Sequence, residues 1–191
     1  MPIFANAYDY KRFIETIRYY QLDGAKPRFS LLTKANTPKA KQTIVEIICF
    51  CLMPNHFHFL LKQTKNNGIS EFLGKLSNSY TRYFNTKHKR VGPLFQGVFK
   101  AIHIDTNEQL LHLSRYIHLN PLVGFLTKDL ELYRWSSYLE YTRVLPTNMC
   151  SKEIILDQFP SRKTYKQFVI DQEDYGKKLE IIKHQLIDFE K

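Results

Sequence analysis

The stretch CFCLMPNHFHFLLKQ, residues 49–63, joins two apolar runs through the turn-forming residues Pro54 and Asn55. The run before the turn, QTIVEIICFCLMP at 42–54, is rich in β-branched and apolar residues. The run after it, HFHFLLKQ at 56–63, also has the length of a strand. Two such runs on either side of a short turn are typical of a β-hairpin. We therefore predict two antiparallel strands, the first of them buried on both faces.

Helical periodicity surrounds this hairpin. Apolar and aromatic residues recur at helical spacing across residues 6–22, and again across about 70–86. Between the second and third predicted helices, VGPLFQGVFKAIHI at 91–104 reads as a turn and a strand. This order of elements predicts an α+β fold with a mainly antiparallel sheet packed against helices.

A third helix is expected directly after that strand. Asp105 or Thr106 can cap its first turn. The helix should continue through TNEQLLHLSRYIHLN and end before Pro121, because proline lacks the N–H that a helix needs.

The chain has 191 residues, 43% of them hydrophobic, which is enough for one substantial core. We predict a single domain over residues 1–145, with Trp135 and its neighbouring tyrosines closing the core. From about residue 146 the sequence becomes charged and amphipathic. Residues 146–191 are therefore expected to form a C-terminal helical appendage.

The charge balance favours a polyanionic partner. Lys and Arg number 28 against 18 Asp and Glu, a net charge of +10. Such a surplus points to nucleic acid before an anionic membrane, although ordinary solubility is an alternative explanation. No run approaches the roughly 18 apolar residues of a membrane span. Three cysteines do not make a disulfide framework, so we expect a soluble cytoplasmic protein without a membrane partner.

Two histidines stand out within the second predicted strand. Side chains alternate faces along a strand, so His56 and His58 should share a face about 6.6 Å apart, with Phe57 and Phe59 on the other. Two neighbouring imidazoles can ligate one divalent ion through their neutral nitrogens. A surface or hydrogen-bonded histidine pair explains the same pattern.

Cys49 and Cys51 offer a competing interpretation of the same stretch. Together with His56 and His58 they could form a tetrahedral zinc site and a small zinc-stabilised nucleic-acid-binding module. However, structural zinc motifs usually separate their cysteines by two to four residues. In a strand buried on both faces, free cysteine also packs as a small hydrophobe.

A metal ion beside a basic surface suggests phosphoryl transfer on nucleic acid, which requires a nucleophile. Tyr116 and Asn120 are four residues apart in the third helix, so both can face one site. Tyr116 could attack a phosphate while Asn120 gives an oxygen to the ion. The alternative is that Tyr116 is a core aromatic and Asn120 a helix-ending residue.

Four motifs in order then carry a family resemblance: LMPNHFHFLLKQ, GPLFQGVFKA, SRYIHLNPLVGF and YRWSSYLEY. Together they resemble the REP-associated tyrosine transposases. These are relatives of the single-tyrosine insertion-sequence transposases in the HUH nuclease superfamily. The resemblance covers roughly residues 8–142.

The resemblance implies a ferredoxin-like HUH domain with the two histidines on a central strand. It implies that His56 and His58 bind Mg²⁺ or Mn²⁺ and that Tyr116 is the nucleophile. Attack on hairpin-bearing single-stranded DNA would leave a covalent 5′-phosphotyrosine and a free 3′-hydroxyl. Asn120 stands where insertion-sequence relatives carry a glutamine ligand, which makes it the third candidate ligand.

One feature departs from the family pattern. Members usually begin with a strand, whereas this chain reaches its first helix almost at once. The missing strand predicts an incomplete sheet with an unpaired edge. It leaves two alternatives, a true start upstream or a decayed copy that binds DNA without cutting it. The oligomeric state stays open, with a homodimer as one option.

Contacts to the DNA are expected from polar residues near the motifs. Lys62 falls on the histidine side of its strand by parity, and Gln96 lies within the LFQG segment. Ordinary solvated charges are the alternative for each basic residue. The DNA-binding candidates are Lys62, Arg82, Arg90, Gln96, Lys100 and Arg115. The histidines without matching partners, read as structural or surface residues, are His103, His112, His118 and His184.

Overall fold

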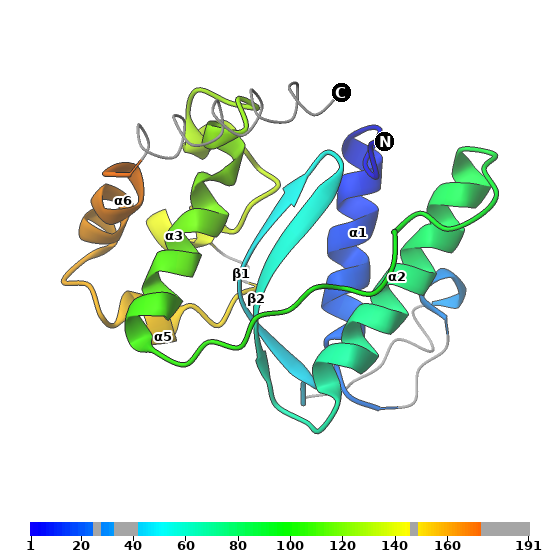
Figure 1. The fold of residues 1–191 in the computed structure, drawn as a ribbon, viewed down its shortest axis with the longest axis horizontal. Helices are drawn as coiled ribbons and strands as arrows, with labels where there is room; N and C mark the ends of the chain where they lie inside the picture. Colours follow the sequence, from blue (N-terminus) through cyan, green and yellow to red (C-terminus); the bar gives the residue numbers. More distant parts are fainter. Residues whose placement is uncertain (25–27, 33–41, 146–148, 173–191) are drawn as a thin grey trace, which may run out of the picture. The chain divides into compact units, whose positions relative to one another are not determined.

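The computed structural model describes residues 1–24, 28–32, 42–145 and 149–172 (Figure 1). The fold is α+β, as predicted, with one two-stranded antiparallel sheet among these residues. None of their helices is long and apolar enough to cross a membrane. In chain order the elements are α1 (Ala7–Tyr20), the 3₁₀ turn η1 (Phe29–Leu31), β1 (Val45–Met53), β2 (His56–Gln63), α2 (Gly68–Lys87), α3 (Asn107–Val123), η2 (Leu130–Leu132), α4 (Tyr138–Thr142), α5 (Glu153–Leu156) and α6 (Arg162–Ile170).

Contacts divide the chain into two compact units, and the β-hairpin supplies residues to both. Unit 1 contains α1, η1 and α2, and unit 2 contains α3 to α6 with most of β1. The hairpin forms as predicted, with its turn at Pro54 and Asn55. All but one of the nine residues of β1 are buried, which confirms a strand covered on both faces.

Aromatic side chains join the two helices of unit 1, which lie side by side (Figure 1). Phe13 of α1 meets Tyr80 of α2 edge to face, with ring centroids 4.8 Å apart. The hydroxyl of Tyr80 donates to the carbonyl of Ile3 at 2.7 Å. Gly68 begins α2 where a Cβ would lie 2.2 Å from the carbonyl oxygen of Ile44, so this close approach needs glycine.

A buried carboxylate also links the two helices. Asp9 is fully buried and accepts from Lys87 at 2.7 Å, from Tyr83 at 3.2 Å and from the main-chain N–H of Ala5 at 3.0 Å. Burial alone would raise the pKa of Asp9. The bonds from Lys87 and Ala5 outweigh it, so the net pKa lies below the ordinary value. Asp9 is therefore ionised and holds the end of α2 against the start of α1.

In unit 2, the segment after α3 covers one edge of β1. Main-chain groups of alternate strand residues point to the same side. Accordingly Leu52 donates to the Trp135 carbonyl at 2.9 Å, and Phe50 accepts from the N–H of Ser137 at 3.0 Å. The Tyr141 hydroxyl donates to the Ile48 carbonyl at 2.7 Å. Among the described residues, this edge of β1 is thus bonded without a further full strand.

His118 connects three parts of unit 2. Its side chain is fully buried and shares hydrogen bonds of 2.8 Å with the hydroxyls of Tyr165 and Ser137. The hydroxyl of Ser137 in turn accepts from the N–H of Phe50 in β1 at 2.9 Å. Burial lowers the pKa of His118 to about 3, so the ring is neutral and donates through one nitrogen only. The structural role predicted for this histidine is confirmed.

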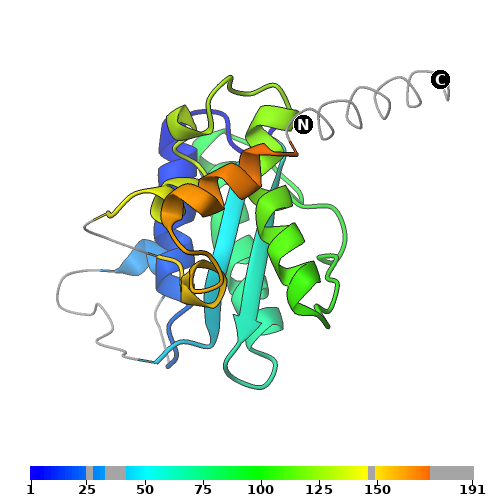
Figure 2. The same ribbon diagram turned by 90° about the vertical axis from the view of Figure 1, so that its left-hand side faces the viewer.

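The helices α5 and α6 contribute to the same core. Ile155, Tyr165 and Val169 are fully buried, and α6 lies beside α3 (Figure 2). The predicted division into 1–145 and 146–191 stays a prediction, since 146–148 and 173–191, including His184, lie outside the described residues. Of the predicted core aromatics near Trp135, Tyr138 and Tyr141 are buried, whereas Trp135 itself is half-buried.

Two predictions of secondary structure are wrong, one helix boundary and one strand. The third helix begins as predicted, with the Thr106 hydroxyl accepting from Gln109 at 3.1 Å, but it runs through Pro121 to Val123. Pro121 falls in the last turn, where one lost hydrogen bond is offset because the proline ring is buried. The strand expected over 91–104 is also absent. A strand needs a partner, and this segment pairs with no strand among the described residues.

Candidate active site

The β-hairpin sets the positions of the two histidines. They are the first and third residues of β2 and so share one face of the strand. His56 is exposed, and its Nδ1 lies 2.7 Å from Oδ1 of Asn55 in the turn. His58 is half-buried. Phe57 and Phe59, on the alternate positions, are half-buried and lie 5.1 Å apart between ring centroids.

The helix α3 carries the predicted nucleophile to His58. The ring of Tyr116 lies edge-on to the imidazole of His58, with centroids 5.6 Å apart and planes at 78°. Although large and aromatic, Tyr116 is 54% exposed, so its phenol can be reached from solvent. The alternative of a core aromatic is therefore wrong for Tyr116. The fold thus brings together, at one surface, a histidine and a tyrosine that are far apart in the sequence.

Asn120 lies one turn further along the same helix. Because α3 continues through Pro121, Asn120 is helical and keeps its four-residue relationship to Tyr116. Its amide Nδ2 donates to the main-chain carbonyl of Tyr116 at 2.7 Å. That bond uses the amide nitrogen and leaves Oδ1 with lone pairs for another partner. The helix-ending role considered for Asn120 is not what the structure shows.

The donor set fits a divalent ion with few protein ligands. Imidazole nitrogens, as on His56 and His58, and amide oxygens, as on Asn120, are donor types that divalent metal ions accept, and water or phosphate oxygens would complete the coordination. Mg²⁺ prefers oxygen ligands and usually retains several waters. No group of three or more His, Cys, Asp or Glu side chains gathers anywhere in the described part of the chain. Beyond the two histidines, an ion held here would need ligands of another kind, such as an amide oxygen, water or phosphate.

The cysteines belong to the core of β1. Cys49 and Cys51 are fully buried, and the thiol of Cys51 lies 3.7 Å from the sulfur of Met53. Burial raises the pKa of both thiols. A zinc ligand must be a thiolate, which this setting opposes. Cys49 and Cys51 are thus apolar core residues, and the zinc-module interpretation loses two of its four ligands.

The predicted DNA-binding residues differ in the contacts that they make within the protein. Lys62 is exposed and forms an ion pair with Glu46 at 3.4 Å. Arg90 donates to the side-chain oxygen of Asn85 at 2.9 Å. Gln96 and Lys100 are exposed in the irregular segment after α2.

Arg115 has a role inside unit 2. Its guanidinium lies 4.2 Å from the ring centre of Phe168 and donates to the Phe168 carbonyl at 3.3 Å. Burial lowers the pKa of Arg115. These contacts join α3 to α6, so the structure gives Arg115 a packing role whether or not it also meets DNA.

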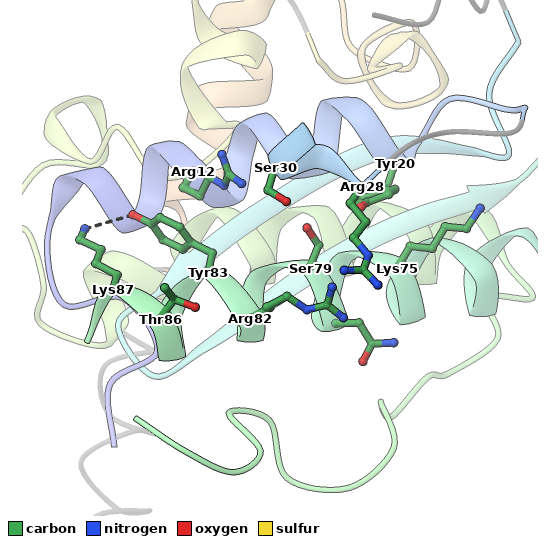
Figure 3. A pocket seen from close by; sticks show the side chains of 11 residues that line it. Arg12, Tyr20, Arg28, Ser30, Lys75, Ser79, Arg82, Tyr83, Thr86 and Lys87 are labelled. Atoms are coloured by element: carbon green, nitrogen blue, oxygen red, sulfur yellow. Dashed lines mark hydrogen bonds between the residues drawn. The ribbon is translucent and has the colours of Figure 1, made fainter. Parts of the chain in front are cut away.

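Arg82 shares a cavity in unit 1 with cations that the sequence did not single out (Figure 3). One sequence feature could have indicated this cavity: Lys75 and Arg82 are seven residues apart and therefore lie on one face of a helix. Arg12 and Arg28 come from distant segments and carried no local signal. The cations around this cavity are Arg12, Arg28, Lys75, Arg82 and Lys87.

A family model described as "Transposase IS200 like" matches residues 25–120, about half of the chain. The chain belongs to the IS200-like transposase family. Membership indicates a transposase that acts on DNA, in a family that generally uses a divalent metal. No curated protein and no solved structure matches significantly.

The matched region of this IS200-like transposase includes both histidines of β2 and ends at Asn120. Tyr116 also falls within it. The segment that covers the edge of β1, together with α4 to α6, lies beyond the match. Thus every residue of the candidate active site lies in the family region.

Proposed function

We propose that this transposase cleaves and rejoins hairpin-bearing single-stranded DNA, with Tyr116 as the nucleophile. The observation that carries the proposal is the contact between the exposed ring of Tyr116 and His58. A tyrosine held against one member of an H-x-H pair, in an IS200-like transposase, has the composition of a metal-assisted phosphoryl-transfer site.

In the proposed reaction, the phenol oxygen of Tyr116 attacks a backbone phosphorus and loses its proton. The new bond joins that oxygen to phosphorus, and the bond from phosphorus to the 3′ oxygen breaks. The leaving 3′ oxygen takes up a proton in place of the one that the phenol lost, so the products are a 5′-phosphotyrosine and a strand ending in a 3′-hydroxyl. Attack by a 3′-hydroxyl on the phosphotyrosine reverses the chemistry, so rejoining needs no ATP.

Each side chain of the candidate site has a separate role in this proposal. His56, His58 and Asn120 would hold the ion, and Tyr116 on α3 would supply the attacking oxygen. When bound, Mg²⁺ or Mn²⁺ supplies Lewis-acid polarisation of a phosphate oxygen. The edge-on contact with His58 restricts the phenol ring, so less orientation has to be gained on binding DNA. The cytoplasmic location expected from the sequence remains a prediction.

The test is a covalent adduct between protein and DNA. Labelled single-stranded DNA with a hairpin is incubated with the protein and Mn²⁺ and separated on a denaturing gel. We expect a band in which the label migrates with the protein. Tyr116→Phe should lose this band yet retain DNA binding, because only the attacking oxygen is removed.

Tyr8→Phe is the matched control. Tyr8 is also an exposed tyrosine, and the substitution removes the same single oxygen. We expect it to form the adduct at the unchanged rate. An adduct that survives Tyr116→Phe would refute the assignment of the nucleophile. Binding without any adduct by the unchanged protein would instead support the DNA-binding relic.

A further inference from the structure

A cavity of about 520 Å³ opens in unit 1 between α1, η1 and α2. Its lining is basic and polar, and no aspartate or glutamate is part of it. Figure 3 shows side chains from both helices around the space, with Arg28 and Arg82 close to one another. Nothing in the reaction proposed for Tyr116 uses these residues.

The three arginines that line the cavity have no carboxylate partner among the described residues. Among the described residues, no carboxylate lies within ion-pair distance of Arg12, Arg28 or Arg82. The two lysines differ, because Lys75 pairs with Glu71 and Lys87 with Asp9. Three neighbouring cations without counter-charges repel one another. The cavity therefore favours an anion, which would relieve that repulsion.

Arg28 and Arg82 are exposed, whereas the guanidinium of Arg12 is held in place by two aromatic rings. Its guanidinium carbon lies 4.3 Å from the ring centre of Phe29 and 5.1 Å from that of Tyr83. Its Nε is buried and has no hydrogen-bond partner in the described part of the chain. A buried donor without an acceptor is costly. The rings of Phe29 and Tyr83 keep the guanidinium of Arg12 in position although its Nε lacks an acceptor.

The shape of the donor set indicates a chain rather than a single small anion. Lys75, Ser79, Arg82 and Thr86 follow each other on one face of α2. From Lys75 to Thr86 the helix rises by eleven steps of about 1.5 Å, which is about 16 Å. Phosphates of a stacked strand follow at about 3.4 Å along the axis, so several would lie along such a row. Hydroxyl and guanidinium donors of this kind are those that contact nucleic-acid backbones.

We propose that this cavity binds the sugar-phosphate backbone of a nucleic-acid strand, as a DNA contact built from unit 1 alone. The inference deepens the proposed function, because it takes the DNA substrate as the ligand. It adds Arg12 and Arg28 to the DNA contacts and joins them to Arg82 in one site. No base is read here, so the contact strengthens binding without selecting a sequence.

The experiment measures fluorescence anisotropy of a labelled single-stranded hairpin oligonucleotide across a salt series. Arg28→Gln with Arg82→Gln removes two cavity charges. Lys11→Gln with Arg18→Gln removes two exposed charges of α1 that do not line the cavity. Because the cavity pair can no longer neutralise two phosphates, we expect the slope of log K against log salt to fall by about 1.4. Affinity at low salt should fall at least about tenfold.

The control pair should change neither the slope nor the affinity beyond the effect of net charge. Equal slopes for the cavity pair and the control pair would overturn the proposal. Circular dichroism melting shows whether each pair is folded, and Arg82→Gln alone repeats the comparison if the double variant is not. The single change should lower the slope by about 0.7.

Two further measurements separate this inference from the proposed function. Adduct formation by the unchanged protein tests Tyr116 chemistry alone. If no adduct forms but the cavity pair still binds DNA more weakly, the cavity assignment stands and the cleavage proposal falls. Inorganic tripolyphosphate is the competing ligand. Should it bind more tightly than the oligonucleotide, the cavity serves a free polyphosphate and the nucleic-acid assignment is wrong.

Discussion

Tyr116 of α3 and His58 of β2 meet edge to face, with ring centroids 5.6 Å apart. This contact joins two motifs that are separate in sequence. It brings an exposed phenol to a strand whose neighbouring same-face residue is His56. The consequences of this contact can be tested one side chain at a time.

Removing the imidazole of His58 should impair adduct formation more than it impairs DNA binding. We expect His58→Ala to slow adduct formation by at least about 100-fold, because a lost metal ligand costs more than the 10- to 100-fold of a lost supporting partner. The rate is measured with the labelled hairpin DNA and Mn²⁺. The control is His103→Ala, since His103 is an exposed histidine without a place in the site. Equal rates for the two variants would exclude His58 from the chemistry.

Substitutions of Asn120 should show whether its side chain binds the metal ion or is only part of the helix. If its Oδ1 binds the ion, Asn120→Ala should weaken Mn²⁺ binding about tenfold. Asn120→Asp should preserve or strengthen it, because carboxylate is a preferred ligand of this ion. Isothermal titration with Mn²⁺ gives the dissociation constants without requiring DNA. An alanine variant that binds Mn²⁺ like the unchanged protein would show that Asn120 is not a ligand.

Acid should destabilise unit 2 through His118. Its pKa is about 3 when folded against an ordinary 6.5, so between these pH values the unfolded chain binds more protons. Stability therefore falls as pH drops from 6.5 toward 3, by up to about 1.4 kcal/mol per pH unit. Urea unfolding at pH 7, 6 and 5 measures it. His118→Gln should be less stable at pH 7, with a gap that narrows on acidification. A constant gap would contradict a buried neutral histidine.

Replacing Ser137 should destabilise unit 2. Its hydroxyl serves His118 and the N–H of Phe50, both buried. We expect Ser137→Ala to lower the free energy of unfolding by about 1–3 kcal/mol for each buried group left without a partner. Ser70→Ala, at an exposed position, should change it by less than about 0.5 kcal/mol. Urea unfolding of both variants gives the comparison.

Much of the local structure follows from residue periodicity. The hairpin about Pro54 and Asn55, the helix beginning at Gly68 and the Thr106 cap are all encoded within a few neighbouring residues. The one-turn spacing of Tyr116 and Asn120 was visible for the same reason. Each of these features depends on contacts within a turn or two of the chain, and such contacts are present in the sequence itself.

Other features depended on which distant partners were present. The segment 91–104 has strand-like residues but pairs with no described strand, and α3 passes Pro121 because burial offsets one lost bond. The edge of β1 is bonded by a segment over 80 residues away in sequence. Arg115, which the sequence predicts as a DNA contact, also packs against Phe168, and only the fold shows this contact.

By itself, the sequence determined which functional groups are present and on which elements they lie: an H-x-H pair on a strand, a tyrosine on a helix and an excess of positive charge. Only the tertiary structure decided that His58 meets Tyr116 while Cys49 is confined to the core. It alone gathered Arg12, Arg28 and Arg82 around one cavity. The reason is physical. Periodicity shows which way a side chain points within its own element, but its neighbours are set by how distant elements bury their apolar faces.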